Sequence, residues 1–346
     1  MERILIVRLS AMGDILNSMP VAAALQDRYP DCTVDWVIEE RWQELLCAKG
    51  TPLFGPPSPQ KPLVNSIFTV NTRRWRKHLF AKSTRTEVGA LRRSIREQDY
   101  TTVVDVQGAI RSAVIARFSK SDIVIGFAKP REPQARFLYT KQVAAKGTHI
   151  IEQNVSLTQL PVPAPGAHRL PHDAAAEAWC EGELQRLGMN GKFAVLSPGA
   201  GWGAKEWPAE RYGELAAMLK KDGILSLVNI GPSETELAGV VERASGGLAK
   251  PLQCSIGQLI ATLRRAALFV GGDTGPMHLA NLMGVPVVAI FGPTNPQRNG
   301  PFYPPFEVVR HESSATDYGH HDREHQGLLN TTSAGVYEAA RKLLRP

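Results

Sequence analysis

The chain has 346 residues, of which 43% are hydrophobic and 21% charged, with a formal net charge of +7. This composition is that of an ordinary folded protein, which excludes a disordered or fibrous chain, and the length exceeds the roughly 250–300 residues at which a single core stops growing, so we expect two domains. No apolar run approaches the ~18 residues of a membrane span. Before Arg8 the only apolar run is the four residues Ile4–Val7, and the four cysteines are scattered without metal-ligand spacing. We therefore expect no signal peptide and a reducing, cytoplasmic location.

The first half of the chain alternates between predicted strands and helices. Ile4–Val7 is a short apolar run typical of a buried parallel strand. Leu9–Asp14 is predicted to be a loop of small residues, and a helix is expected from Ile15 to near Pro30. Further strands of the same sheet are predicted at Thr33–Val37, Thr101–Val106 and Asp122–Phe127.

A proline-rich stretch at 160–171 predicts a stiff linker, because four prolines there cannot continue a helix or an inner strand. A second series follows, with a helix at Ala174–Leu187 and a closing helix at Ala334–Leu344. Its strands are predicted at Phe193–Leu196, Leu225–Ile230, Leu268–Val270 and Val285–Phe291. This alternation predicts two doubly wound α/β domains with parallel sheets, facing a central cleft. We place them at residues 1–165 and 172–330, and expect the last helix, 331–346, to pack back on the first domain.

Basic residues concentrate in one part of the chain. Residues 51–150 carry 18 Lys and Arg against 6 Asp and Glu, whereas residues 151–346 carry 17 against 19. The first half therefore either binds an anionic partner or presents a solvated basic face. Arg73, Arg76 and Lys77 surround a tryptophan, with Arg111 and Arg131 later in the same half. Arginine matches carboxylate and phosphate geometry, and no nucleic-acid-binding module accompanies these residues.

Three loops carry groups suited to chemistry. Ser10-Ala11-Met12-Gly13-Asp14 follows the first strand, where Gly13 permits a tight turn and Asp14 is either a helix N-cap or a general base. The loop from Ser197 to Pro208 combines three glycines with Lys205, a pattern that suits a polyanion. The segment 270–280 ends a strand in glycines and starts a helix near Pro276, and such a helix N-terminus is a natural pyrophosphate seat. Glu234 follows another strand and could reach a sugar hydroxyl.

These motifs together resemble glycosyltransferase family nine, the lipopolysaccharide heptosyltransferases. The resemblance rests on Ser-Ala-Met-Gly-Asp at 10–14, Lys-Glu-Trp-Pro at 205–208 and Gly-Asp-Thr-Gly-Pro-Met-His at 272–278. The basic run at 73–77 and Asp-Val-Gln-Gly at 105–108 look most like heptosyltransferase I, which adds the first heptose to Kdo. The match covers residues 1 to about 300.

The resemblance implies a GT-B fold with the acceptor bound by the N-terminal domain and the nucleotide sugar by the C-terminal domain. It implies inverting, metal-independent transfer from ADP-L-glycero-D-manno-heptose to Kdo-lipid A, with no cofactor. Asp14 becomes the expected base, and Lys205 the group that stabilises departing ADP. Glu234 and Asp273 would contact heptose or ribose hydroxyls, while the amides from Thr274 to His278 would hold the diphosphate. The expected donor-binding residues are Ser197, Gly199, Ala200, Gly201, Lys205, Glu234, Asp273, Thr274, Gly275, Pro276, Met277 and His278. The expected acceptor-binding residues are Ser10, Ala11, Gly13, Arg73, Arg76, Lys77, Gln107, Arg111 and Arg131.

Other functions stay open at this point. A heptosyltransferase acting later in the core, or a transferase of another nucleotide sugar, would have the same motifs. A sugar-nucleotide epimerase can share the two-domain fold, and a non-catalytic anion-binding module would make Asp14 dispensable. For the transferase we expect peripheral binding at the inner face of the inner membrane, weakening with salt, and no nucleic-acid partner. No oligomeric state is predicted. The chain departs from the family pattern at the polar, histidine-rich segment 311–326, which we interpret as a solvated loop rather than a metal site.

Overall fold

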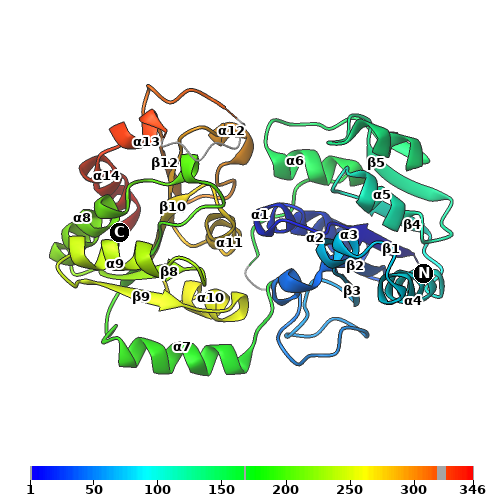
Figure 1. Ribbon diagram of the computed structural model, residues 1–346, viewed down its shortest axis with the longest axis horizontal. Coiled ribbons are helices and arrows are strands. Elements are labelled where there is room, and N and C mark those ends of the chain that lie inside the picture. Colours follow the sequence, from blue (N-terminus) through cyan, green and yellow to red (C-terminus); the bar gives the residue numbers. More distant parts are fainter. Residues whose placement is uncertain (1, 167–168, 318–324, 346) are drawn as a thin grey trace. The chain divides into compact units, whose positions relative to one another are not determined.

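The computed structural model describes residues 2–166, 169–317 and 325–345. The chain forms two compact units, and the change from the first to the second falls between Ala164 and Asp173 (Figure 1). This boundary overlaps the proline-rich stretch at 160–171.

The first unit is built on a six-stranded parallel sheet in the order β3-β2-β1-β4-β5-β6. Its inner strand β1 is apolar and buried from Ile4 to Val7, as expected of a parallel strand covered on both faces. Val7 at the end of β1 pairs with Val37 and with Asp105, so the loops after β1, β2 and β4 leave the same carboxyl edge. The strands are β1 (Arg3–Val7), β2 (Thr33–Glu39), β3 (Ser66–Val70), β4 (Thr102–Asp105), β5 (Ile123–Phe127) and β6 (Lys141–Val143).

Helices connect and cover this sheet. The apolar side of α4 places Leu91 and Ile95 in a core with Leu5, Val103 and Val124 of the strands. The helical segments of the first unit are α1 (Met12–Leu16), α2 (Met19–Arg28), η1 (Glu40–Leu45), α3 (Thr72–Lys77), α4 (Lys82–Arg96), α5 (Ile110–Ala116), η2 (Pro133–Leu138), α6 (Ile150–Val155) and η3 (Ser156–Thr158).

The segment after β1 differs from our prediction of a loop to Asp14 and one helix from Ile15. Helix α1 begins at Met12, and a second helix, α2, begins at Met19. Pro20 lies in the first turn of α2, and a proline is tolerated there but not in a helix interior, where its missing N–H would break the ladder. The interruption between α1 and α2 follows from that residue.

The second unit repeats the architecture with the order β12-β11-β10-β7-β8-β9, again all parallel. Gly271 in β10 pairs with Ser197 at the end of β7 and with Ala289 in β11, so the loops after these strands also share one edge. The strands are β7 (Phe193–Ser197), β8 (Leu225–Ile230), β9 (Ala249–Gln253), β10 (Leu268–Gly272), β11 (Val287–Ile290) and β12 (Phe306–Val309).

The closing helix belongs to this second unit. Val336, Ala339 and Ala340 lie in the same core as Val270, and the helix contacts α8 and strands β10, β11 and β12. The helix is therefore part of the core of the second unit, and its packing on the first domain stays a prediction. The helical segments here are α7 (Ala174–Arg186), η5 (Gly203–Lys205), α8 (Ala209–Lys221), α9 (Thr235–Ala244), α10 (Ile256–Leu263), α11 (Gly275–Leu282), α12 (Pro296–Asn299), α13 (Gln326–Asn330) and α14 (Ser333–Leu344).

In the described residues, none of the helices has the length and apolar character needed to cross a membrane. All four cysteines are free.

Candidate active site

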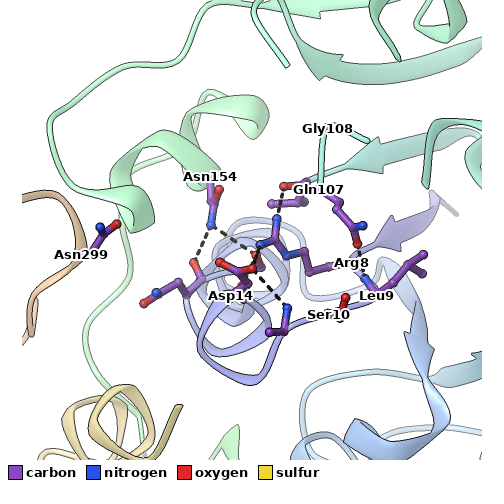
Figure 2. Close-up of polar contacts among 12 residues, drawn as sticks. Arg8, Leu9, Ser10, Asp14, Gln107, Gly108, Asn154 and Asn299 are labelled. Carbon is purple, nitrogen blue, oxygen red and sulfur yellow. Dashed lines mark hydrogen bonds and ion pairs between the residues drawn. The ribbon is translucent and has the colours of Figure 1, made fainter. Parts of the chain in front are cut away.

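In the first unit, the loops after β1 and β4 are joined by buried hydrogen bonds. The Arg8 guanidinium donates through Nη1 to the carbonyl of Val106 at 2.8 Å, and the amide of Leu9 donates to Oε1 of Gln107 at 2.8 Å (Figure 2). Gln107 is 6% exposed. Its amide oxygen therefore fixes the backbone of the neighbouring loop, and contact of Gln107 with the acceptor substrate stays a prediction.

Asp14 lies at the third position of α1, and Ala11 occupies the N-cap position. The interpretation of Asp14 as N-cap is therefore wrong. Its Oδ2 forms an ion pair with Nη2 of Arg8 at 2.8 Å and accepts a hydrogen bond from the amide of Ala11 at 3.2 Å (Figure 2). Within the described residues no hydrogen bond to Oδ1 is found, and the side chain is 42% exposed. One carboxylate oxygen is thus anchored while the other faces solvent. Gly13 lies inside α1, so it does not form the tight turn that we predicted.

The backbone that carries Asp14 is held from a distant segment. The hydroxyl of Ser18 donates to the Asp14 carbonyl at 2.7 Å. In α6, the Asn154 amide nitrogen donates to the Asn17 carbonyl at 3.0 Å and to the Ser18 hydroxyl at 3.3 Å (Figure 2). Asn154 is 1% exposed, and it fixes the end of α1.

Positive side chains gather at the same edge of the first sheet. Nη2 of Arg111 lies 3.4 Å from the hydroxyl of Ser10. Partial burial lowers the pKa of the Arg41 guanidinium, and the charges of Arg73 and Arg111 lower it further against the opposing effect of Glu39. Arg41 follows β2, Arg73 follows β3 and Arg111 follows β4, so all three stand at the carboxyl edge of this sheet, and we call them the basic cluster. Our sequence analysis missed Arg41, because it stands outside the arginine run.

The other predicted acceptor residues are placed as follows. Arg76 and Lys77 are exposed on α3, and Arg131 is exposed in the loop after β5. The backbone of Arg131 lies against the loop after β4, because a Cβ built on Gly108 would stand 3.1 Å from the Arg131 nitrogen.

Asp105 organises the loop after β4 from inside the protein. It is fully buried, and it accepts from the amides of Gln107 and Gly108 at 2.9 and 3.3 Å, from the Ser112 hydroxyl at 2.9 Å and from the Tyr139 hydroxyl at 2.8 Å. Burial raises the pKa of Asp105, although these four hydrogen bonds oppose the shift. The Asp-Val-Gln-Gly motif therefore shapes the loop that leads to Arg111 rather than presenting its carboxylate to a ligand.

In the second unit, Lys205, Asp273 and His278 form one polar cluster. Nζ of Lys205 lies 2.6 Å from Oδ2 of Asp273, and Nε2 of His278 lies 3.3 Å from its Oδ1. The three side chains are 16%, 9% and 8% exposed. Burial on its own raises the pKa of Asp273, but the hydrogen bond from His278 and the positive charge of Lys205 outweigh it and hold that pKa well below its usual range.

This depressed pKa predicts a defined pH dependence of stability. A carboxylate with a lowered folded-state pKa stabilises the fold above its unfolded pKa of about 3.9 and loses that contribution as the pH falls. We expect Asp273→Asn to lower the free energy of unfolding of the second unit by about 3–5 kcal/mol at pH 7, because it leaves the charge of Lys205 without its buried partner. The difference from wild type should shrink below about pH 4, where Asp273 begins to be protonated in the unfolded chain. Urea titrations of both proteins at several pH values measure this, and a difference independent of pH would contradict the assignment.

Helix α11 begins beside this cluster, with Thr274 at its N-cap and Pro276 in its first turn. Of the amides from Thr274 to His278 that we expected to hold a diphosphate, two are excluded. Pro276 has no amide hydrogen, and the His278 amide donates to the Thr274 carbonyl at 3.3 Å. Met277 is wholly buried, so that residue can contribute only its backbone. The first-turn amides of Gly275 and Met277 have no partner within a helix.

Glu234 joins the loops after β7 and β8. Its Oε2 accepts from the amide of Gly231 at 2.7 Å, and its carboxyl group lies so close to Gly199 that a Cβ there would stand 2.2 Å from Oε1. The amide of Ala200 donates to Oε1 of Glu206 at 3.3 Å. This hydrogen bond occupies an amide that we predicted to bind the donor. Ser197 is 3% exposed, and its hydroxyl accepts from Asn229 at 3.4 Å, which indicates a supporting role.

Gly199 and Gly201 form a matched pair for mutation. We expect Gly199→Ala to push the Glu234 carboxylate away from the Gly231 amide and to cost about 1 kcal/mol of stability for the lost hydrogen bond. Gly201→Ala should be tolerated, because nothing lies within 4 Å of the Cβ that it adds. Thermal melts of both variants, with and without ADP, check this. Equal melting temperatures for the two variants would show that the Glu234 contact is not required.

The histidine-rich segment is only partly described. His320, His321, Asp322 and Glu324 lie outside the described residues. Nδ1 of His311 lies 2.8 Å from the Ser313 hydroxyl, and Nε2 of His325 lies 3.2 Å from the carbonyl of Ala315. In the residues that the structure describes, no group of three or more His, Cys, Asp or Glu side chains is arranged to hold a metal ion.

Comparison with known proteins identifies the family. The profile of glycosyltransferase family 9 (heptosyltransferase) matches residues 88–327, more than half of the chain. The chain belongs to this family. It is 29% identical over 304 residues to lipopolysaccharide heptosyltransferase 1 of Pseudomonas aeruginosa, covering 87% of this chain and 81% of the relative. It is 28% identical over 299 residues to lipopolysaccharide heptosyltransferase 1 of Escherichia coli, covering 85% and 89%.

Solved structures agree with this assignment. Escherichia coli heptosyltransferase WaaC with ADP superposes with a TM-score of 0.77 at 25% identity, covering 99% of each chain. The protein is thus a glycosyltransferase of the GT-B type, with two six-stranded parallel sheets. The α/β fold predicted from the sequence is confirmed. Membership of a transferase family decides against the epimerase and against a non-catalytic anion-binding module.

Proposed function

We propose that this glycosyltransferase moves L-glycero-D-manno-heptose from ADP-heptose to the Kdo of Kdo-lipid A, with inversion at the anomeric carbon. The observation that carries the proposal is the difference between the contacts of the two carboxylate oxygens of Asp14. Its Oδ2 is anchored by Arg8 and the Ala11 amide, while Oδ1 has no partner among the described residues. A carboxylate held in this way can accept the proton of an acceptor hydroxyl without first breaking its own contacts.

The second unit would bind the donor. Relatives of similar fold were solved with ADP and with ADP-2-deoxy-2-fluoro heptose, which supports a nucleotide sugar for this chain. The amides of Gly275 and Met277 and the dipole of α11 would receive the diphosphate. Lys205 would neutralise the charge that gathers on ADP as it departs. Glu234 and Asp273 would then contact hydroxyl groups of the heptose or the ribose.

The proposed reaction is a single displacement. The acceptor oxygen attacks the anomeric carbon as Asp14 takes its proton, the bond from that carbon to the diphosphate oxygen breaks, and ADP leaves with the electron pair. The chain's own groups supply a base and fixed positive charge, and we propose that the reaction needs no metal or cofactor.

The basic cluster favours an acidic acceptor. Kdo carries a carboxylate on its ring, whereas the acceptor of a later step is a heptose, whose ring carries none. Arg41, Arg73 and Arg111 present guanidinium forks, which match a carboxylate or phosphate geometrically. We therefore favour transfer to Kdo over a later step. The lipid-linked acceptor implies a cytoplasmic enzyme bound peripherally at the inner face of the inner membrane.

The test is ADP release from ADP-heptose with three acceptors: none, Kdo-lipid A, and a core lipid that already ends in heptose. The proposal predicts rapid release only with Kdo-lipid A. Preference for the heptose-terminated lipid would assign a later step. Absence of release with every acceptor would exclude ADP-heptose as donor and direct the assay to other nucleotide sugars.

A further inference from the structure

A pair of large apolar side chains is unusually exposed at the end of α3. Leu79 is 62% exposed and Phe80 is 81% exposed. Single exposed apolar residues are common on protein surfaces, but adjacent ones on one turn form a patch, and such patches mark interaction sites. Both side chains stand within the first unit, immediately after Arg76 and Lys77.

The turn that carries this pair is held in place by its own backbone. The amide of Ala81 donates to the His78 carbonyl at 3.0 Å, and the hydroxyl of Thr84 donates to the same carbonyl at 2.8 Å. Thr84 is buried at 6% exposure. The turn is therefore tied to the start of α4, and the two apolar side chains are presented from a defined position.

Positive charge surrounds the pair on both sides. No aspartate or glutamate occurs from residue 71 to residue 86. Arg74 is paired with Glu87, with Nη2 and Oε2 2.5 Å apart, but no ion pair is found in the described structure for the other basic residues of this stretch. These residues are all exposed: Arg73, Arg76, Lys77, Lys82 and Arg85.

We propose that Leu79 and Phe80 insert into the interface of an anionic lipid bilayer while the surrounding lysines and arginines contact lipid phosphates. Charge complementarity selects the partner, because an acid-free basic surface around an apolar tip fits anionic headgroups above acyl chains. An aromatic ring and a leucine are suited to that depth. This inference rests on the proposed function, because it assumes an acceptor that is embedded in a membrane. To the electrostatic attraction between basic residues and anionic lipids it adds an apolar contact with the bilayer.

The two contacts can be separated by their dependence on salt. Electrostatic attraction is screened as ionic strength rises, whereas apolar insertion is not. We expect Leu79→Ser/Phe80→Ser to lower the partition coefficient onto phosphatidylglycerol–phosphatidylcholine vesicles by roughly tenfold or more at every salt concentration. The slope of binding against salt should stay that of wild type. The charge variant Lys82→Gln/Arg85→Gln should instead make the slope shallower.

Two controls make the experiment decisive. Leu248→Ser removes an apolar side chain that is 40% exposed on the second unit, and it should not change vesicle binding. Turnover with a deacylated, water-soluble Kdo acceptor should be unchanged in Leu79→Ser/Phe80→Ser, and near-ultraviolet circular dichroism reports its fold independently of activity. If no acceptor is turned over, the proposed function fails, but the vesicle measurement still tests whether Leu79 and Phe80 insert into the bilayer.

A positive probe completes the test. Phe80→Trp should add a fluorescence component that shifts to the blue when anionic vesicles are present and is quenched by brominated lipid. Undiminished vesicle binding by Leu79→Ser/Phe80→Ser, or a tryptophan at position 80 that stays in water, would overturn the proposal. Failure of the wild type to bind anionic vesicles would overturn it as well and leave the patch to a protein partner.

Discussion

Asp14→Asn is expected to lower acceptor-dependent ADP release by roughly 10²–10⁴-fold, the usual contribution of a general base. The asparagine has the same shape, and its oxygen can still accept the hydrogen bond from the Ala11 amide, so the loop should keep its shape. What it loses is the ability to take the acceptor proton. Binding of ADP by the second unit should be unaffected. Steady-state turnover with saturating Kdo-lipid A, together with ADP affinity by calorimetry, measures both quantities.

The matched control for Asp14 is Asp27, another exposed carboxylate of the first unit, which pairs with Arg169. Asp27→Asn removes the same charge and should leave turnover within a factor of about two, because surface ion pairs contribute little. Turnover by Asp14→Asn at the wild-type rate would show that the acceptor loses its proton to another group or to water.

Lys205→Ala should reduce turnover by roughly 10²–10³-fold, the range seen when one preorganised charge-stabilising group is removed. The ammonium is needed most when negative charge has moved onto the departing ADP, so kcat should fall more than the affinity for ADP-heptose. Arg76→Ala, on the exposed face of α3, should act mainly on the acceptor KM. Steady-state kinetics with both substrates varied separate the two effects.

Lys205 also neutralises Asp273, so a loss of activity could arise from a damaged fold. Removing one partner of a buried ion pair costs about 3–5 kcal/mol when the other charge is left uncompensated. The double variant Lys205→Ala/Asp273→Asn removes both charges and should regain stability without regaining turnover. If the double variant recovers activity, the role of Lys205 is structural.

The strands that the sequence predicts are the inner strands of both sheets. Inner strands are covered on both faces, so their sequences are apolar runs that are easy to recognise. The inner strands are β1, β2, β4 and β5 in the first sheet and β7, β8, β10 and β11 in the second. The four strands that were missed are the four edge strands. β6 has no fully buried residue, and β9 contains Pro251, which an edge strand tolerates because one side of its backbone needs no partner.

The candidate site was predictable only where its residues are close together in the sequence. Asp14 and the Gly-Asp-Thr-Gly-Pro-Met-His segment follow strands directly, and parallel strands bring such loops to one edge. The contribution of Asn154 depends on contacts 136 and 137 residues away, and no local pattern reveals it. Arg8 could have been found from its position, because a charged residue directly after a buried strand needs a partner.

The central claim is tested most directly by the product. Kdo-lipid A is incubated with ADP-heptose and the enzyme, and the lipid is analysed by mass spectrometry and by NMR of its new anomeric proton. The account predicts a gain of one heptose per lipid, attached to Kdo with the anomeric configuration opposite to that of the donor. An unchanged lipid mass, a heptose attached elsewhere or a retained configuration would contradict it.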